Sequence, residues 1–327
     1  MARPVVLCTQ AIHEAARAML EPLADVLAPT DAAAGSLDSL LPEADYLVVR
    51  NRLRPGFLDQ PHRLRAIVRH GTGLDMIPMD AATRQGIPVA NVPGANAQAV
   101  AEYVIGSFFA LARRFAATDH ALRQQGWNEA RCAAGSGVEL AGRTVGIVGV
   151  GNVGSRIAVT CSAGLGMRVL AHHPRASAVP VGVECVPLDA LLASSDFIAL
   201  CCPLTPETRG LLDARRIALI KPTAFLVNAA RGELVDEISL ADALHRRAVA
   251  GAAVDVYATQ PLAPDHPFRR LDNMLLTPHV ASLTQESSVA MGVGTARQLL
   301  QLMRGERPQH LVNGEVWAGW LWARRAG

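Results

Sequence analysis

Short apolar runs alternate with helix-like segments along most of the chain, a pattern typical of parallel strands joined by helices. In the first third of the sequence the runs predict strands at residues 4–8, 45–49, 66–70 and 87–91. After an irregular stretch they predict strands at residues 144–150, 168–173, 183–187, 196–202, 224–230, 249–257 and 273–279. The pattern therefore predicts an α/β fold with two groups of parallel strands.

A long apolar stretch separates the two groups of strands. Its pattern predicts one helix over residues 98–124, with Gly126 as the stop signal. The helix carries apolar residues on more than one face, among them Phe108, Phe109 and Phe115. Part of this surface suits a second subunit. The alternative is that the helix is buried between the domains.

The length of the chain and its last segment indicate two domains. A chain of 327 residues exceeds the usual size of a single core. The amphipathic segment at 284–304 ends at Gly305 and has no strands of its own to cover, so we expect it to pack on the first unit. We therefore predict one domain made of residues 1–98 and 287–327, and another made of residues 99–286.

The composition excludes several classes of function. Half of the residues are hydrophobic, 18% are charged and the formal net charge is +2, so the chain can bury a large core. It holds no cluster of like charge that would suggest nucleic acid or a polybasic membrane surface. No apolar run approaches the length of a membrane span, and the N-terminus lacks the apolar region of a signal peptide. We therefore expect neither a nucleic-acid partner nor a membrane.

The cysteines and the lysine content argue against three further kinds of site: a metal site, a P-loop and a Schiff-base lysine. The six cysteines show no CxxC or other metal-binding spacing, so we expect buried free thiols, no metal and a reducing cytoplasmic location. Lys221 is the only lysine and lies in no suitable motif. A P-loop or a Schiff-base mechanism is therefore not expected.

A glycine-rich turn gives the first positive indication of function. The sequence GVGNVG, Gly149 to Gly154, directly follows an apolar strand and opens a helix. Gly149 permits the tight turn, Gly151 lets the backbone approach a pyrophosphate, and Gly154 allows the helix to pack closely on the strand. The first amides of the helix, near Asn152 and Val153, then favour the phosphates. The turn predicts dinucleotide binding, and the alternative is a purely structural turn.

The next strand should deliver the residue that contacts the adenosine ribose. An acid at its end would accept hydrogen bonds from the 2′-hydroxyl and repel a 2′-phosphate, but His173 occupies that position. Arg175, two residues later, offers donors suited to a phosphate. The favoured cofactor is therefore NADP rather than NAD. The alternative is that these side chains are solvated loop residues and NAD binds.

Three later strands each end in a polar side chain. Arg231 follows the predicted strand at 224–230, Asp255 and Gln260 belong to the next strand and its loop, and His279 ends the one after. Because ligands bind outside the carboxyl ends of parallel strands, we expect these side chains to converge. An arginine can pair with a carboxylate, and an imidazole can exchange a proton near neutral pH.

These motifs together resemble the D-isomer-specific 2-hydroxyacid dehydrogenase family. The quoted sequences that carry the resemblance include LVNAARGELVDE, GAAVDVYATQPL and LLTPHVASLTQES. The matching segments are 70–106, 138–158, 203–214, 226–237, 251–262, 275–287 and 312–317. The resemblance implies two Rossmann-like domains, a flavodoxin-like substrate domain and a doubly wound parallel-sheet dinucleotide-binding domain. It also implies a homodimer.

The resemblance implies an activity and assigns residues to it. The reaction is hydride transfer between NAD or NADP and C2 of a small 2-oxo or 2-hydroxy acid, and we expect a reductase of the glyoxylate or hydroxypyruvate type. Arg231 binds the substrate carboxylate and carbonyl oxygen, and His279 is the general acid in reduction. The implied cofactor contacts are Gly149, Gly151, Asn152, Val153, Gly154, His173, Arg175, Ala229, Ala230, Arg231, Asp255, His279 and Ala281.

The resemblance also places a substrate loop in the first domain. Backbone amides of Gly71, Thr72 and Gly73 correspond to the loop that holds the substrate carboxylate, where glycines let the backbone close on an anion. Arg50 corresponds to the start of a second substrate loop. It either touches the substrate or is simply exposed.

Gln260 departs from the family pattern, in which a glutamate before proline hydrogen-bonds the catalytic histidine. The glutamine can still accept a hydrogen bond but cannot stabilise an imidazolium by charge. We therefore expect the activity optimum to lie toward acid pH. An alternative follows from the same departure: a catalytically weakened NAD(P)-binding sensor or corepressor-like protein with the same fold.

Overall fold

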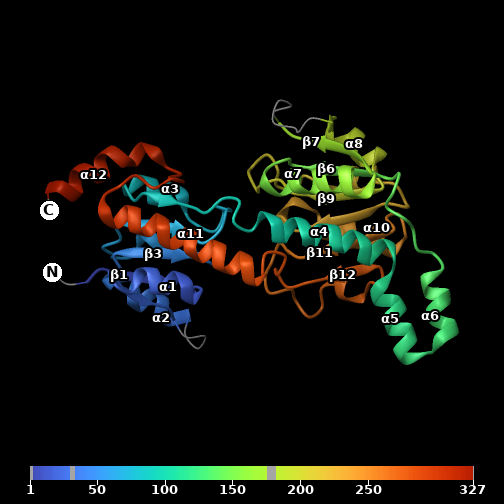
Figure 1. Cartoon of the computed structure of the whole chain (residues 1–327), viewed down its shortest axis with the longest axis horizontal. Coiled ribbons are helices and arrows are strands. Elements are labelled where there is room, and N and C mark those ends of the chain that lie inside the picture. Colours follow the sequence, from blue (N-terminus) through green and yellow to red (C-terminus); the bar gives the residue numbers. More distant parts are fainter. Residues whose placement is uncertain (1–2, 30–33, 175–181, 327) are drawn as a thin grey trace. The chain divides into compact units, whose positions relative to one another are not determined.

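The computed structural model describes residues 3–29, 34–174 and 182–326 of the chain (Figure 1). It divides into two compact units, residues 1–96 with 284–327 and residues 97–283. Both are parallel α/β units, so the predicted fold class is confirmed. Every expected strand is present, each shorter than or equal to its predicted run.

The first unit contains a five-stranded parallel sheet with the order β2-β1-β3-β4-β5, which is the flavodoxin-like order. Its strands are β1 (Val5–Cys8), β2 (Asp25–Leu27), β3 (Tyr46–Val49), β4 (Ala66–Arg69) and β5 (Val89–Ala90). Its helices are α1 (Glu14–Leu20), α2 (Ala34–Leu40), α3 (Met79–Arg84), α11 (Gln285–Arg304) and α12 (Trp317–Ala326). The expected last segment is α11, which ends at Gly305 in a left-handed conformation and packs on α1.

The second unit contains a seven-stranded parallel sheet with the order β12-β11-β10-β9-β6-β7-β8. Its strands are β6 (Thr144–Val148), β7 (Arg168–His172), β8 (Glu184–Cys185), β9 (Phe197–Leu200), β10 (Phe225–Asn228), β11 (Gly251–Val254) and β12 (Met274–Leu276). Its helices are α4 (Ala97–Ala112), α5 (Phe115–Gln124), α6 (Trp127–Ala134), α7 (Asn152–Val159), α8 (Leu188–Ser194), α9 (Ala214–Ile217) and α10 (Glu237–His245). The strand order reverses between β6 and β9, which makes this the switch point where such sheets bind ligands.

Both faces of the seven-stranded sheet are buried. Along β10, Leu226 packs into one apolar cluster and Val227 into the other, because successive side chains point to opposite faces. Helices α8 and α10 contribute to the first cluster, and α4 and α7 contribute to the second. Burial on both faces explains why these strands read as continuous apolar runs in the sequence.

The predicted single helix at 98–124 is wrong. The structure has two helices, because α4 ends at Ala112 and α5 begins at Phe115. Between them Arg114 adopts a left-handed backbone, with φ of 53°, and this conformation ends a right-handed helix. Phe108 is also fully buried, with its ring 5.2 Å from that of Phe197, so it belongs to the core rather than to a subunit surface.

The cysteines are free, but they are not uniformly buried. Cys132 and Cys185 are exposed, which corrects the expectation for these two. Cys8 and Cys161 lie in the two cores, and burial raises the pKa of each thiol to about 12. These two side chains therefore stay protonated and act as small apolar residues.

Candidate active site

The ends of three neighbouring strands bring Arg231, Asp255 and His279 to one edge of the seven-stranded sheet. Strand β11 lies between β10 and β12, with Asn228 opposite Val254 and Val254 opposite Leu276. Arg231 and His279 each follow three residues after these aligned positions, and Asp255 follows directly after Val254. Since neighbouring strands are about 4.8 Å apart, β10 and β12 are separated by about 10 Å.

His279 has a left-handed backbone with φ of 59°. This conformation is uncommon for a residue with a side chain and persists only where the surroundings enforce it. Here the amide of His279 donates to the carbonyl oxygen of Asp255 at 2.7 Å. The amides of Val280 and Ala281 donate to the two carboxylate oxygens of Asp255 at 2.8 and 2.9 Å. One fully buried aspartate therefore holds the strained turn that presents the imidazole.

Two tyrosines and a threonine complete the support of this turn. Thr277 donates its hydroxyl proton to Asp255 at 2.6 Å, so the hydroxyl of Tyr103, 2.6 Å from Thr277 Oγ1, is the donor of that second bond. Tyr257 donates to the carbonyl of Thr277 at 3.0 Å. Burial raises the pKa of Tyr103, and burial together with the charge of Asp255 raises the pKa of Tyr257 to about 12. Both hydroxyls therefore remain donors.

Gln260 fixes the tautomer of the neutral His279 ring. The Gln260 amide nitrogen donates to the carbonyl of Tyr257 at 3.3 Å, which directs its oxygen toward the imidazole. That oxygen lies 3.0 Å from His279 Nδ1, so Nδ1 carries a proton and donates. A neutral imidazole in this orientation carries its acceptor lone pair on Nε2. The expected pairing of Gln260 with His279 is present in the structure.

Arg231 follows β10 in a segment ordered by Asn228. The buried amide of Asn228 donates to the carbonyl of Arg231 at 2.9 Å and accepts from the amide of Ala230 at 3.1 Å. Arg231 Nη1 donates to the carbonyl of Ala230 at 2.6 Å. Ala229 and Ala230 themselves lie between the strand and the arginine, at the same sheet edge.

The next residue, Gly232, packs tightly against the loop after β11. A Cβ atom at Gly232 would lie 2.0 Å from the carbonyl carbon of Tyr257 and 2.2 Å from the nitrogen of Ala258. Only glycine permits this approach without movement of the backbone. The segment that carries Arg231 and the loop that carries Gln260 are therefore in direct backbone contact.

The glycine-rich turn lies after β6 at the switch point of the sheet. A Cβ at Gly149, whose φ is 95°, would lie 2.7 Å from the backbone of Cys202, and one at Gly154 would lie 2.2 Å from the Gly149 carbonyl oxygen. A Cβ at Gly151 would meet no described atom within 4 Å. Gly151 is the N-cap of α7, and no side chain caps the amides that begin at Asn152 and Val153. Gly151 and Asn152 are exposed. This geometry fits a pyrophosphate.

His173 follows directly after β7, which pairs with β6 so that His172 lies opposite Val148. The Gly149 amide donates to the carbonyl of His172 at 2.9 Å, which ties the end of β7 to the glycine-rich turn. His173 is half-buried. Arg175, the second expected cofactor contact on this segment, lies outside the described residues.

In the first unit, an arginine that the sequence analysis did not single out orders the predicted substrate loop. Arg69 is buried and donates to the carbonyls of Val49, His70 and Gly73 at 2.9, 2.7 and 2.9 Å. Gly71 has φ of 132°, a conformation that favours glycine. Thr72 accepts a bond from Asn91 through its carbonyl at 3.0 Å.

The expected substrate contact Arg50 follows β3. Its amide donates to Thr9 Oγ1 at 2.8 Å, and its guanidinium donates to the carbonyl of Ala11. Burial lowers the pKa of Arg50. The side chain is therefore half-buried and bonded within its own unit rather than simply exposed.

Asp255 and Ala281 have contacts that the sequence did not reveal. Both were expected to touch the cofactor, yet the carboxylate of Asp255 has no exposed surface and accepts three bonds from its own unit. The amide of Ala281 is one of those donors. In this structure the two residues hold the histidine turn, a role for which the only sequence signal is an acid at the end of a buried strand.

Residues 3–29, 34–174 and 182–326 hold neither a metal cluster nor a membrane-spanning helix. Within these ranges no three His, Cys, Asp or Glu side chains are grouped so that they could hold a metal ion. Within the same ranges no helix has the length and apolar character needed to cross a membrane.

Comparison with known proteins identifies the family. Residues 105–281, more than half of the chain, match the family model of the D-isomer specific 2-hydroxyacid dehydrogenase NAD-binding domain. Glyoxylate reductase from Aeropyrum pernix is 37% identical over 97% of this chain and 98% of its own length. D-3-phosphoglycerate dehydrogenase from Methanocaldococcus jannaschii is 35% identical over 94% of this chain, which spans 59% of that relative.

The solved structures agree with this assignment. An NADPH-dependent glyoxylate/hydroxypyruvate reductase from Sinorhizobium meliloti, in complex with NADP and malonate, superposes with a TM-score of 0.82 and 25% identity. The match covers 95% of this chain and 97% of the reductase. The chain therefore belongs to the D-isomer-specific 2-hydroxyacid dehydrogenases, a family of oxidoreductases with a nicotinamide dinucleotide-binding Rossmann domain.

Proposed function

We propose that the protein is an NADPH-dependent reductase of small 2-oxo acids, of the glyoxylate or hydroxypyruvate type, that forms D-2-hydroxy acids. One observation carries this proposal. His279 is held in a strained turn with Nδ1 bonded to Gln260, at the same sheet edge as Arg231 and the glycine-rich turn. Relatives named glyoxylate reductase support the substrate class.

The residues at the switch point fit a dinucleotide cofactor. The amides of Gly151, Asn152 and Val153 and the positive end of α7 would hold the pyrophosphate, and the open space before Gly151 would admit it. When bound, the nicotinamide supplies the hydride that reduces C2. His173, in place of an acid, would not repel a 2′-phosphate, which favours NADPH over NADH.

Arg231 and His279 would act on the substrate. The guanidinium of Arg231 would pair with the carboxylate of the 2-oxo acid through charge-assisted hydrogen bonds. His279, protonated at Nε2, would donate its proton to the oxygen on C2 while Nδ1 stays bonded to Gln260. In the first unit the Gly71 amide donates to the carbonyl of Arg69 at 2.9 Å, so the amides of Thr72 and Gly73 would bind the substrate carboxylate. Arg50 would contact the substrate.

A substrate panel tests the proposal. The oxidation of NADPH and of NADH is followed by absorbance with glyoxylate, hydroxypyruvate, 3-phosphohydroxypyruvate and pyruvate. We expect turnover with the small 2-oxo acids, and a loss of about 10²- to 10⁴-fold in kcat for His279→Gln. The phosphorylated acid is included because several relatives are named D-3-phosphoglycerate dehydrogenase. A preference for 3-phosphohydroxypyruvate would change the proposed substrate. Absence of turnover with every acid would refute the proposed enzymatic activity.

The comparisons give no support to the alternative, a nucleotide sensor weakened at Gln260. The same panel separates the two functions. A sensor would bind NADPH without oxidising it in the presence of any 2-oxo acid. An enzyme would show both binding and turnover.

The proposal includes a homodimer in the cytoplasm. Helices α5 and α6 project from the second unit (Figure 1), and Phe115, Leu122 and Trp127 on them are 55%, 49% and 69% exposed. Apolar side chains exposed on such a projecting pair of helices favour burial against another copy. Sedimentation equilibrium of the wild type and of Trp127→Glu tests this. We expect a dimer that the variant weakens, and a wild-type monomer would contradict it.

A further inference from the structure

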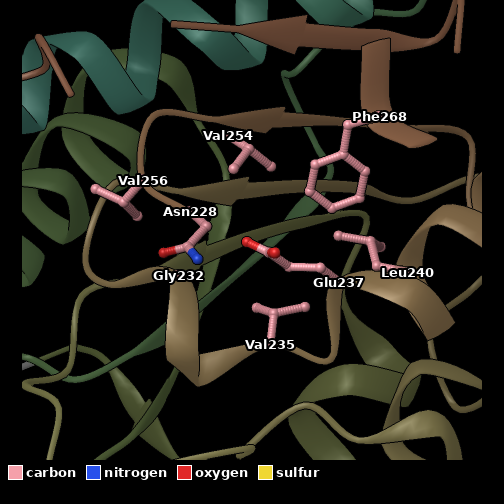
Figure 2. Close-up of a pocket in the computed structure, with 8 residues that line it drawn as sticks. All are labelled: Asn228, Gly232, Val235, Glu237, Leu240, Val254, Val256 and Phe268. Carbon is pink, nitrogen blue, oxygen red and sulfur yellow. The ribbon is translucent and has the colours of Figure 1, made fainter. Parts of the chain in front are cut away.

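Glu237 lies at the first turn of α10, six residues after Arg231, and its carboxylate is enclosed. Figure 2 shows it pointing toward the space lined by Asn228, Val254, Val256 and Phe268. The N-cap of α10 is provided by Asp236, which accepts from the amide of Ser239 at 3.1 Å. Glu237 is therefore not required to cap its own helix, although it occupies the first turn.

The two oxygens of Glu237 bind two points of one loop. Oε1 accepts a hydrogen bond from the amide of Ala258 at 2.9 Å. Oε2 lies 3.3 Å from Nε2 of His266, and the two side chains are only 14% and 15% exposed. His266 Nδ1 accepts from the amide of Phe268 at 3.3 Å, so Nε2 carries the proton that is donated to Glu237.

The loop between these two anchors carries Gln260. Residues 258–261 and 263–265 are exposed, so this part of the loop has little packing of its own. Its ends are fixed by Glu237, by the backbone contact of Ala258 with Gly232, and by the ring of His266 packed 4.6 Å from that of Phe268. The position of Gln260 therefore depends on the contacts at the two ends of the loop.

We propose that Glu237 and His266 are positioning residues for the general acid. They fix the 258–266 loop so that Gln260 Oε1 meets His279 Nδ1, and through Gly232 they fix the loop relative to Arg231. Gln260 makes one uncharged hydrogen bond to the imidazole, which is weaker than the bond from a carboxylate and so depends more on the placement of the loop. This inference rests on the proposed function for its catalytic consequence.

Kinetics of four variants test the proposal. Glu237→Ala and His266→Ala remove the anchors, Glu237→Gln keeps an acceptor for Ala258, and Asp242→Asn is a control at an exposed position of the same helix. We expect Glu237→Ala and His266→Ala to lower kcat by about 10- to 100-fold, since small displacements of a catalytic group have effects of this size. KM for the 2-oxo acid and Kd for NADPH should change less than about threefold. Glu237→Gln should recover most of kcat, and Asp242→Asn should match the wild type.

A second readout does not depend on turnover. NMR measures the apparent pKa of the His279 ring, whose signal is assigned by its absence in His279→Gln. This apparent pKa should change in Glu237→Ala and in Gln260→Ala. The double variant should shift no further, because both changes break the same contact. If the wild type reduces no 2-oxo acid but the ring responds in this way, positioning is supported and only the proposed function fails.

Other outcomes overturn the positioning role. One is a wild-type kcat and a wild-type His279 titration in both alanine variants. Another is an effect confined to KM. Should the alanine variants fail to fold, as judged by circular dichroism, His266→Gln decides, because it removes the imidazole that is bonded to Glu237 Oε2. A lowered kcat with a changed His279 titration would support the positioning role, and a wild-type kcat and titration would overturn it.

Discussion

The backbone amide of His279 donates to the backbone carbonyl of Asp255 across 2.7 Å, and the Asp255 carboxylate accepts from the next two amides of the same turn. The residue proposed as general acid therefore has its conformation set by an acid with no exposed surface. This arrangement separates two tasks that the sequence places on neighbouring strand ends. Asp255 builds the turn, and His279 is presented by it.

Replacing Asp255 with Asn should destabilise the second unit. The amide of asparagine offers one acceptor oxygen, so one of the Val280 and Ala281 amides would face an NH₂ group. We expect a loss of about 2–4 kcal/mol in the free energy of unfolding, since the lost bonds are buried and charge-assisted. Denaturant titration checks this, with exposed Asp242→Asn as the control. Equal stability of the two variants would contradict the structural role.

Replacing His279 with Asn should lower the activity but leave the stability of the fold nearly unchanged. Asparagine tolerates the left-handed region at least as well as histidine, so the turn keeps its conformation with φ of 59°. We expect kcat to fall by about 10²- to 10⁴-fold while the free energy of unfolding changes by less than about 1 kcal/mol. A matched His279→Val variant, β-branched and strained in that region, should be clearly less stable. Equal stability of the Asn and Val variants would argue against strain at this position.

Much of this arrangement could be predicted from the sequence, because parallel strands buried on both faces read as continuous apolar runs. Arg231 and His279 could be placed at one edge for the same reason: each follows such a run. Strand β2 was missed, since its three residues at the sheet edge form no clear run. The break at Arg114 was missed because no glycine or proline marks it.

The hydrogen bonds that hold the site together were harder to predict from the sequence than Arg231 and His279 themselves. The sequence shows an acid at the end of β11 but not its donors, because Thr277, Val280 and Ala281 become its neighbours only when β12 pairs with β11. Arg69 likewise lies inside the run predicted as a strand at 66–70, and its bonds to the carbonyls of His70 and Gly73 depend on the loop that follows. Tertiary contacts of this kind leave no local pattern.

Replacing Gln260 with Glu should move the pH dependence of reduction upward. A carboxylate beside His279 Nδ1 stabilises the imidazolium and raises the histidine pKa, typically by about 1–3 units. Because the protonated ring is the proposed proton donor, activity should persist to higher pH in the variant than in the wild type. The pH profile of kcat/KM for the 2-oxo acid measures this, with Gln260→Ala as the control for loss of the hydrogen bond alone. An unchanged profile would mean that proton transfer from His279 does not limit the rate.

Replacing His173 with Asp should change the cofactor preference. An aspartate after β7 would accept from a ribose 2′-hydroxyl and repel a 2′-phosphate. We expect the ratio of kcat/KM for NADPH to that for NADH to fall by about tenfold or more, which corresponds to about 1.4 kcal/mol. His173→Asn, which keeps an acceptor without the charge, is the matched control. A wild type that already prefers NADH a hundredfold would remove the NADPH assignment.

His70 should make the first unit sensitive to acid. It is 6% exposed, its Nε2 has no hydrogen-bond partner among the described residues, and burial, with the charges of Arg50 and Arg69, lowers its pKa to about 4. In the unfolded chain the pKa is about 6.5, so between these values the unfolded state binds more protons and stability falls as pH falls. The free energy of unfolding should drop by up to about 3 kcal/mol over this range relative to His70→Gln. Denaturant titrations at several pH values measure the difference, with His62→Gln as the control, and parallel pH dependences of the wild type and His70→Gln would show that His70 does not titrate in this way.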